Sequence, residues 1–137
     1  NKVLKGLDVL GVPEKRSQGY WATENYCCGT AGILQLYVGA YLAFGNQSYF
    51  DLAKRTADKL LEYATIDETD AKWIQAFERK EPDNLTAALG YYDGAAGIAT
   101  SLLHFDQLLN DNFAYHRIID DPYPSTKRLD SVAKPFR

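Results

Sequence analysis

One pattern of seven residues occurs twice, as Cys28-Gly29-Thr30-Ala31-Gly32-Ile33-Leu34 and, 65 positions later, as Asp93-Gly94-Ala95-Ala96-Gly97-Ile98-Ala99. Both copies open a stretch that is poor in charged residues. The motif glycines are Gly29, Gly32, Gly94 and Gly97. Because glycine has no side chain, such a pair at a helix start lets another backbone or a ligand approach closely. The repeat predicts stacked helical hairpins, and it leaves open whether the glycines only pack helices or also make room for a ligand.

Hydrophobic residues recur at helical spacing in four stretches of the chain. The predicted helices cover about 3–10, 31–44, 48–64 and 95–109. We expect the third to begin with a capping box, in which Ser48 and Asp51 satisfy exposed main-chain amides. A short helix is predicted around Trp73, Ile74 and Phe77, and an extended segment at 117–122. The predicted fold class is therefore all-α, with residues arranged as helical hairpins.

Charge and hydropathy exclude two classes of partner. The chain has 15 basic and 18 acidic side chains, a net charge of −3, and no run of Lys or Arg. A nucleic-acid surface needs clustered positive charge, so we expect no nucleic-acid partner. Residues 25–50 carry no charged side chain, but the helical part of that stretch is shorter than the roughly 18 to 20 apolar residues that a bilayer requires. We expect a buried helix there and no membrane span.

The two cysteines, Cys27 and Cys28, are adjacent. Two thiols cannot build the disulfide framework of a small secreted domain, and neighbouring cysteines rarely pair because their disulfide is strained. The first residues also lack the apolar segment of a signal peptide. We therefore expect a cytoplasmic location, and a chain that begins inside a larger protein.

Three segments together resemble one protein family. They are Tyr26-Cys27-Cys28-Gly29-Thr30-Ala31-Gly32-Ile33, Gly90-Tyr91-Tyr92-Asp93-Gly94-Ala95-Ala96-Gly97-Ile98-Ala99 and Arg117-Ile118-Ile119-Asp120-Asp121-Pro122. The combination is similar to the C-terminal part of the lanthionine synthetase C-like (LanC-like) family. The resemblance implies an α/α toroid, a ring of helical hairpins, of which this chain supplies about the last two. Residues 1–122 would belong to the toroid and residues 123–137 would form a polar tail.

The same resemblance implies zinc chemistry. Cys27 and Cys28 occupy the place of the adjacent pair of Zn²⁺ ligands in that family, and the third ligand would be a cysteine from an upstream hairpin. A Zn²⁺ ion with three protein ligands and an open position is typical of a catalytic site. A peptide cysteine bound there would lose its proton and add to dehydroalanine or dehydrobutyrine, which closes a thioether (lanthionine) ring. We expect the 137-residue chain alone to be inactive, because it lacks the upstream cysteine and the family's acid/base histidine.

The sequence leaves other functions open. A toroid with incomplete zinc ligation would be a non-catalytic module that binds a peptide or a thiol such as glutathione. A sugar-processing α/α toroid would instead need paired carboxylates, for which Glu24, Asp70 and Asp93 are available. The expected partners are a dehydrated lanthipeptide precursor or a thiol ligand, together with the remaining hairpins of the toroid or a partner chain.

Further residues are candidates for a substrate cleft. They are Trp21, Tyr26, Tyr92 and Asp93. The aromatic side chains would either line a peptide groove or plug the core, and Asp93 would either face the cleft or cap the helix that follows it. We expect His104 to have a packing or capping role and His116 to be exposed, so neither replaces the missing acid/base histidine.

Overall fold

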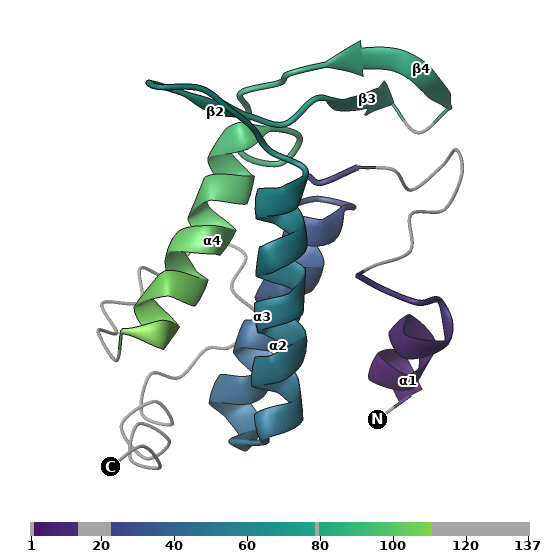
Figure 1. The fold of residues 1–137 in the computed structure, drawn as a ribbon. Coiled ribbons are helices and arrows are strands. Elements are labelled where there is room, and N and C mark those ends of the chain that lie inside the picture. Colours follow the sequence, from purple (N-terminus) through teal and green to yellow (C-terminus); the bar gives the residue numbers. More distant parts are fainter. Residues whose placement is uncertain (1, 14–22, 79, 111–137) are drawn as a thin grey trace.

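The computed structural model describes residues 2–13, 23–78 and 80–110. Three helices stand side by side, and strands cross one end of them (Figure 1). In chain order the elements are α1 Lys2–Val9, α2 Thr30–Phe44, α3 Gln47–Glu62, β1 Thr65–Ile66, β2 Ala71–Lys72, β3 Gln75–Glu78, β4 Glu81–Thr86 and α4 Ala95–Leu109. The described part of the chain is therefore mostly helical, with two small antiparallel hairpins, β1–β2 and β3–β4.

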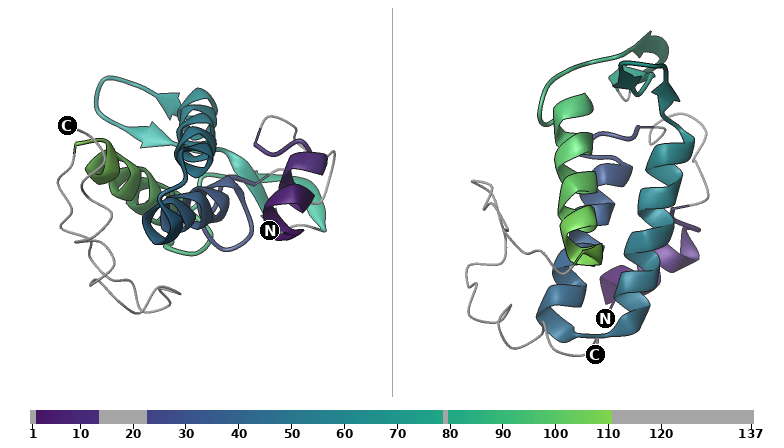
Figure 2. Two further views of the ribbon diagram at one scale, coloured as in Figure 1. Left: turned by 90° about the horizontal axis from the view of Figure 1, so that it is seen from below. Right: turned by 60° about the vertical axis from the view of Figure 1, so that its left-hand side comes forward.

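Helix α2 is the centre of the core and packs against both α3 and α4. Its buried side chains include Leu34, Tyr37 and Tyr41. Aromatic contacts connect the three helices. The centre of the Phe50 ring on α3 lies 5.4 Å from the ring centre of Tyr41 on α2 and 5.9 Å from that of Phe105 on α4. Figure 2 shows the three helices clustered in both further views. The predicted buried helices at 31–44 and 95–109 are confirmed.

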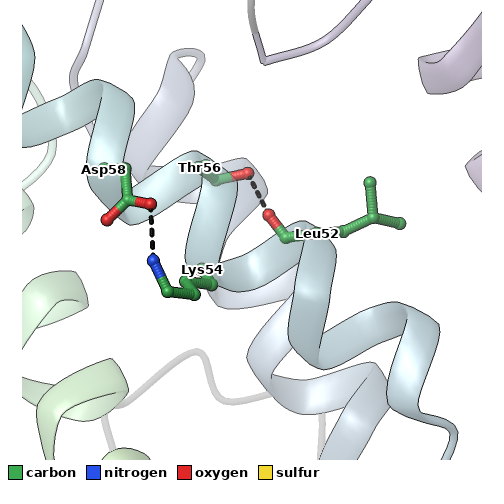
Figure 3. A network of polar contacts seen from close by, with 4 residues as sticks. All are labelled: Leu52, Lys54, Thr56 and Asp58. Carbon is green, nitrogen blue, oxygen red and sulfur yellow. Dashed lines mark hydrogen bonds and ion pairs between the residues drawn. The ribbon is translucent and has the colours of Figure 1, made fainter.

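Helix α3 confirms the predicted helix at 48–64, is amphipathic, and forms an antiparallel hairpin with α2. On its buried side the hydroxyl of Thr56 donates to the carbonyl oxygen of Leu52 over 2.7 Å, and on its exposed side Lys54 pairs with Asp58 at 2.9 Å (Figure 3). Surface pairs of that kind add little stability, so the hairpin depends on its apolar face. The two helices thus form one helical hairpin of the kind that the repeat predicts, with α2 buried and α3 amphipathic.

The start of α3 differs from the predicted capping box. The cap is Asn46, whose side-chain oxygen accepts hydrogen bonds from the main-chain nitrogen of Ser48 at 3.0 Å and from its hydroxyl at 2.9 Å. The hydroxyl of Ser48 is therefore a donor to Asn46 and does not cap the helix itself. An asparagine side chain caps a helix start as well as serine does, and here it lies two residues earlier.

The all-α expectation is wrong for residues 65–86, and the short helix predicted around Trp73 is absent. Strand β1 pairs with β2, and β3 pairs with β4, where Gln75 lies opposite Thr86. The reason lies in residues 73–75, where burial alternates: Trp73 and Gln75 are buried, whereas Ile74 between them is 50% exposed. A period of two belongs to extended backbone, and the bulky residues there satisfy it better than a helix would.

The remaining expectations concern the ends of the chain and His104. Helix α1 confirms the predicted first helix and ends just before Gly11, whose φ is 75°. His104 is 3% exposed and its Nδ1 lies 2.7 Å from Nε2 of Gln35 on α2, which confirms a packing role. Residues 117–122, the tail 123–137, Trp21 and His116 lie outside the described residues.

No helix within residues 2–13, 23–78 and 80–110 has the length and apolar character that crossing a membrane requires.

Candidate functional site

Two loops that share a pair of main-chain hydrogen bonds precede α2 and α4. We call residues 23–29 the first glycine loop and residues 88–94 the second glycine loop. In each loop, two main-chain nitrogens at the start of the helix donate to carbonyl oxygens of the loop. In the first loop the bonds run from Thr30 to Thr23 at 3.2 Å and from Ala31 to Glu24 at 3.0 Å. In the second loop they run from Ala95 to Ala88 at 2.9 Å and from Ala96 to Leu89 at 3.4 Å. Every donor and acceptor of the second loop is 65 positions after its counterpart, so the sequence repeat is also a structural repeat.

The motif glycines lie against the backbone of their own loops. A side-chain carbon placed at Gly29 would lie 2.4 Å from the carbonyl oxygen of Thr23, and one at Gly94 would lie 2.3 Å from that of Ala88. The same holds for the second glycine of each motif. A side-chain carbon at Gly32 would lie 2.4 Å from the carbonyl oxygen of Tyr26, and one at Gly97 would lie 1.9 Å from that of Tyr91. Only glycine allows this approach, and the space that it leaves is filled by the loop itself and not by a ligand.

The two loops meet at one end of the helices, where α2 and α4 both begin (Figure 1). The main-chain nitrogen of Cys27 donates to the carbonyl oxygen of Tyr92 over 2.9 Å. The ring of Tyr26 lies 5.1 Å from that of Tyr91 and 6.3 Å from that of Tyr92. Tyr92 remains 53% exposed, so this aromatic cluster packs the loops together and also presents a ring to solvent.

The two cysteines differ in exposure. Cys27 is exposed, and Cys28 is partly buried. The side-chain oxygen of Asn25 accepts hydrogen bonds from the main-chain nitrogen of Cys28 at 3.0 Å and from its Sγ at 3.4 Å. The Oγ1 of Thr23 lies 3.9 Å from the same sulfur. The thiol of Cys28 is thus held in one orientation, and the thiol of Cys27 is open to an incoming group.

A glutamine from the strand region connects the loops. Gln75 on β3 is 2% exposed, and its Oε1 accepts a hydrogen bond from the main-chain nitrogen of Glu24 at 2.8 Å. Its Nε2 donates to the carbonyl oxygen of Asp93 at 2.8 Å. The side chain of Gln75 therefore bridges the first and second glycine loops.

A family model described as lanthionine synthetase C-like protein matches residues 15–118, which is most of the chain. The chain belongs to the lanthionine synthetase C-like family. Comparison with curated proteins gives no match, and comparison with solved structures gives none either.

In this LanC-like chain, Asp93 does not cap the helix that follows it. The N-cap of α4 is Gly94 and carries no side-chain hydrogen bond, so Asp93 does not cap the helix in the way that the sequence allowed. Its carboxylate is exposed and lies over Gly90, where an added side-chain carbon would be 2.0 Å from Oδ1. Asp93 takes the repeat position of Cys28, and Gly90 takes that of Asn25.

The three carboxylates considered for sugar chemistry lie in different settings. Glu24 is a buried residue of the first glycine loop, 1% exposed, whereas Asp93 is an exposed residue of the second. Asp70 belongs to the turn between β1 and β2, where its main-chain nitrogen donates to Asp67. This arrangement gives no support to a pair of carboxylates facing one bond.

A zinc ion would find part of its ligand set in this LanC-like chain. No group of three His, Cys, Asp or Glu side chains suited to a metal occurs among residues 2–13, 23–78 and 80–110. The thiols of Cys27 and Cys28 are suitable donors, and the hydroxyl of Thr23 is placed to donate to a thiolate on Cys28. Thiolates are ligands that Zn²⁺ prefers, so the donor chemistry of this pair is compatible with zinc.

Sequence reasoning missed two residues of the site, Asn25 and Gln75. An asparagine three positions before a cysteine, at the entry to a helix, is a pattern for a side chain that bonds to its own main chain, and it was available in the sequence. Gln75 had no such signal, because it lies 51 positions from its partner Glu24.

Proposed function

We propose that this chain is part of a zinc-dependent cyclase that forms thioether (lanthionine) rings in a peptide. In the reaction, the sulfur of a peptide cysteine bonds to the β-carbon of dehydroalanine or dehydrobutyrine, and the α-carbon takes up a proton. The observation that carries the proposal is the pair of thiols at the junction of the two glycine loops, with Cys27 exposed and Cys28 held by Asn25. Family membership supports the same function.

Each residue of the first loop has a distinct part in this proposal. Cys27 and Cys28 would hold the zinc ion, and a cysteine from outside the described residues would be the third protein ligand. Bound zinc would act as a Lewis acid that favours the thiolate form of the substrate cysteine. Asn25 fixes the main chain of Cys28, and Thr23 is placed to donate a hydrogen bond to its sulfur.

The aromatic cluster is the proposed wall of the peptide site. The carbonyl oxygen of Tyr92 accepts a hydrogen bond from the main-chain nitrogen of Cys27, and the side chain of Tyr92 is exposed. Tyr26 supports that ring from the first loop. An exposed aromatic ring beside a reactive group offers a flat apolar surface for a peptide segment. The exposed carboxylate of Asp93 would lie at the same junction.

The second candidate is a LanC-like module that binds a peptide or glutathione without catalysis. No group of three ligand side chains occurs among residues 2–13, 23–78 and 80–110, and both candidates are compatible with that. Metal content separates the two candidates, because a module without catalysis does not need a bound zinc ion at this junction.

The test compares the full-length protein with its Cys27→Ala, Cys28→Ala and double variants. We expect about one zinc ion per wild-type molecule by elemental analysis, and its loss in the double variant. Ring formation in a dehydrated peptide, followed by mass spectrometry after thiol labelling, should be lost in parallel. Lys54→Ala, at an exposed position on α3, is the control and should keep both properties. A zinc-free wild-type protein, or a double variant that still forms rings, would reject the cyclase proposal.

A further inference from the structure

The two hydrogen bonds of Gln75 close a ring of contacts that joins the two glycine loops and includes Cys27. The chain from Glu24 to Cys27 forms one side, and the Cys27 nitrogen donates to the Tyr92 oxygen at 2.9 Å. Asp93 follows Tyr92, and its carbonyl oxygen accepts from Gln75, whose Oε1 returns to the Glu24 nitrogen. Gln75 is therefore the side chain that completes this circuit.

We propose that Gln75 is a positioning residue for the Cys27–Cys28 pair: by fixing the main chain of Glu24 relative to Asp93, it holds both thiols in the geometry that metal binding requires. This inference rests on the proposed function for its zinc and ring-forming consequences. Its geometric part, the placement of the two thiols, stands on the contacts of Gln75 alone.

The chemistry of the amide matches both partners. Its oxygen faces an N–H group and its nitrogen faces a carbonyl oxygen, so only one orientation of the amide satisfies both bonds. Both contacts are 2.8 Å long and Gln75 is 2% exposed, so water does not replace either bond at low cost. Asparagine is one methylene shorter, and glutamate has no donor when ionised.

The strand region holds Gln75 firmly. Two residues earlier on the same side of the extended chain, Trp73 donates its Nε1–H to the carbonyl oxygen of Leu60 at 2.7 Å. Leu60 is in the last turn of α3, so this bond attaches the start of the β3–β4 hairpin to the helical bundle. Figure 1 shows the strands across the end of the bundle where α2 and α4 begin. The hairpin thus presents Gln75 from a fixed support.

Two substitutions in the full-length protein separate positioning from general stability. Gln75→Met keeps the approximate size of the side chain and removes both hydrogen bonds. Gln75→Glu keeps the shape and the acceptor, and it regains a donor only when the carboxyl is protonated. Thr56→Val is the matched control, because it removes a hydrogen bond of a buried threonine on α3 outside the loops. Circular dichroism and thermal unfolding verify that each variant is folded at the assay temperature.

The first measurement needs neither zinc nor activity. In chelator-treated protein, the alkylation rates of Cys27 and Cys28 are read from their peptide by mass spectrometry. In the wild type, Cys27 should react faster, because Cys28 is partly buried and its sulfur contacts Asn25. In Gln75→Met the rate at Cys28 should rise several-fold, whereas Thr56→Val should leave it unchanged. An equal rate at Cys28 in wild type and Gln75→Met would overturn the proposal.

The second measurement concerns the proposed reaction. Gln75→Met should weaken zinc affinity by about tenfold in competition with a chelating dye and lower kcat with little change in KM. Gln75→Glu should also bind zinc more weakly and react more slowly than the wild type. Both differences should shrink as the pH is lowered toward the pKa of the introduced carboxyl, since protonation of that carboxyl restores the donor. If the wild type neither binds zinc nor forms rings, the proposed function fails while the alkylation result still decides the role of Gln75. If Thr56→Val lowers zinc affinity and kcat as much as Gln75→Met does, Gln75 has only a stabilising role and the proposal is wrong.

Discussion

The main-chain nitrogen of Cys27 donates to the carbonyl oxygen of Tyr92, its own counterpart 65 positions later in the repeat. The two glycine loops therefore meet through equivalent positions. The bond uses only main-chain atoms, so replacing either side chain leaves donor and acceptor in place. This is why Cys27→Ala can test ligation of a metal with little disturbance of the junction between the loops.

Gly97→Ala should destabilise the fold by about 2–3 kcal/mol, because overpacking at a rigid site forces the backbone to shift. The added carbon would lie 1.9 Å from the carbonyl oxygen of Tyr91 and 2.8 Å from the Cβ of Tyr26. The matched control is Gly6→Ala on α1, where nothing lies within 4 Å. It should raise helix stability by about 0.5–1 kcal/mol. Urea unfolding measures both changes, and a Gly97→Ala variant as stable as the wild type would contradict the close approach.

Trp73→Phe should lower the free energy of unfolding by about 2 kcal/mol, because it leaves the carbonyl oxygen of Leu60 without the indole donor and removes buried apolar area. The bond that it breaks is 2.7 Å long. Phe77→Leu is the control, at an exposed position in the same hairpin, and should change stability by less than about 0.5 kcal/mol. If both variants unfold at the same denaturant concentration, the indole bond does not attach the hairpin to α3.

Gln35→Leu should lower the free energy of unfolding by about 1–2 kcal/mol, because the amide of Gln35 is a hydrogen-bond partner of the buried ring of His104. The bond joins α2 to α4 across the core. Gln47→Leu is the comparison, since Gln47 makes an exposed side-chain bond to Asp51. Thermal unfolding should separate the two variants clearly, and equal midpoints would show that the contact between Gln35 and His104 adds nothing.

The turn between β1 and β2 should respond to acid through Asp67. The main-chain N–H groups of Thr69 and Asp70 donate to its carboxylate, and they lower its pKa from the ordinary value of 3.8. A carboxyl whose pKa is lower in the folded state than in the unfolded state stabilises the fold. That stabilisation is fully present above the unfolded-state pKa and is lost as the pH falls through the folded-state pKa. The amide resonances of Thr69 and Asp70 should therefore titrate with a midpoint below 3.8. Asp67→Asn should abolish that transition, and a midpoint at or above the ordinary value would contradict the turn geometry.

Cys28→His should slow ring formation by the full-length protein without removing zinc. A site with three thiolates gives more charge to the metal than a mixed site, which leaves the substrate sulfur more nucleophilic. Metal content by elemental analysis and initial cyclisation rate are measured on the same sample. A variant with full zinc content and an unchanged rate would show that the second cysteine is not needed for reactivity.

The sequence predicted the helical elements well because their signals are local. Apolar runs fixed α2 and α4, and the spacing of polar and apolar residues fixed α3. The predicted cap of α3 was wrong, because Asn46 and Ser48 are both suitable N-cap residues and lie two positions apart. The helix predicted around Trp73 was also wrong, because a short run of bulky residues suits a strand as well as a helix. The motif containing Cys27 and Cys28 was visible for the same reason, since its residues are consecutive.

By itself the sequence determined the helices, the repeat of the glycine motif and the pair of adjacent thiols. Each of these depends on residues within a few positions of one another, and local backbone preferences and side-chain periodicity act over that range. Only the tertiary structure decided that the two loops touch through Cys27 and Tyr92, and that Gln75 bridges them. Those contacts join residues 65, 51 and 18 positions apart, and they require helix packing and the β3–β4 hairpin to bring distant segments together.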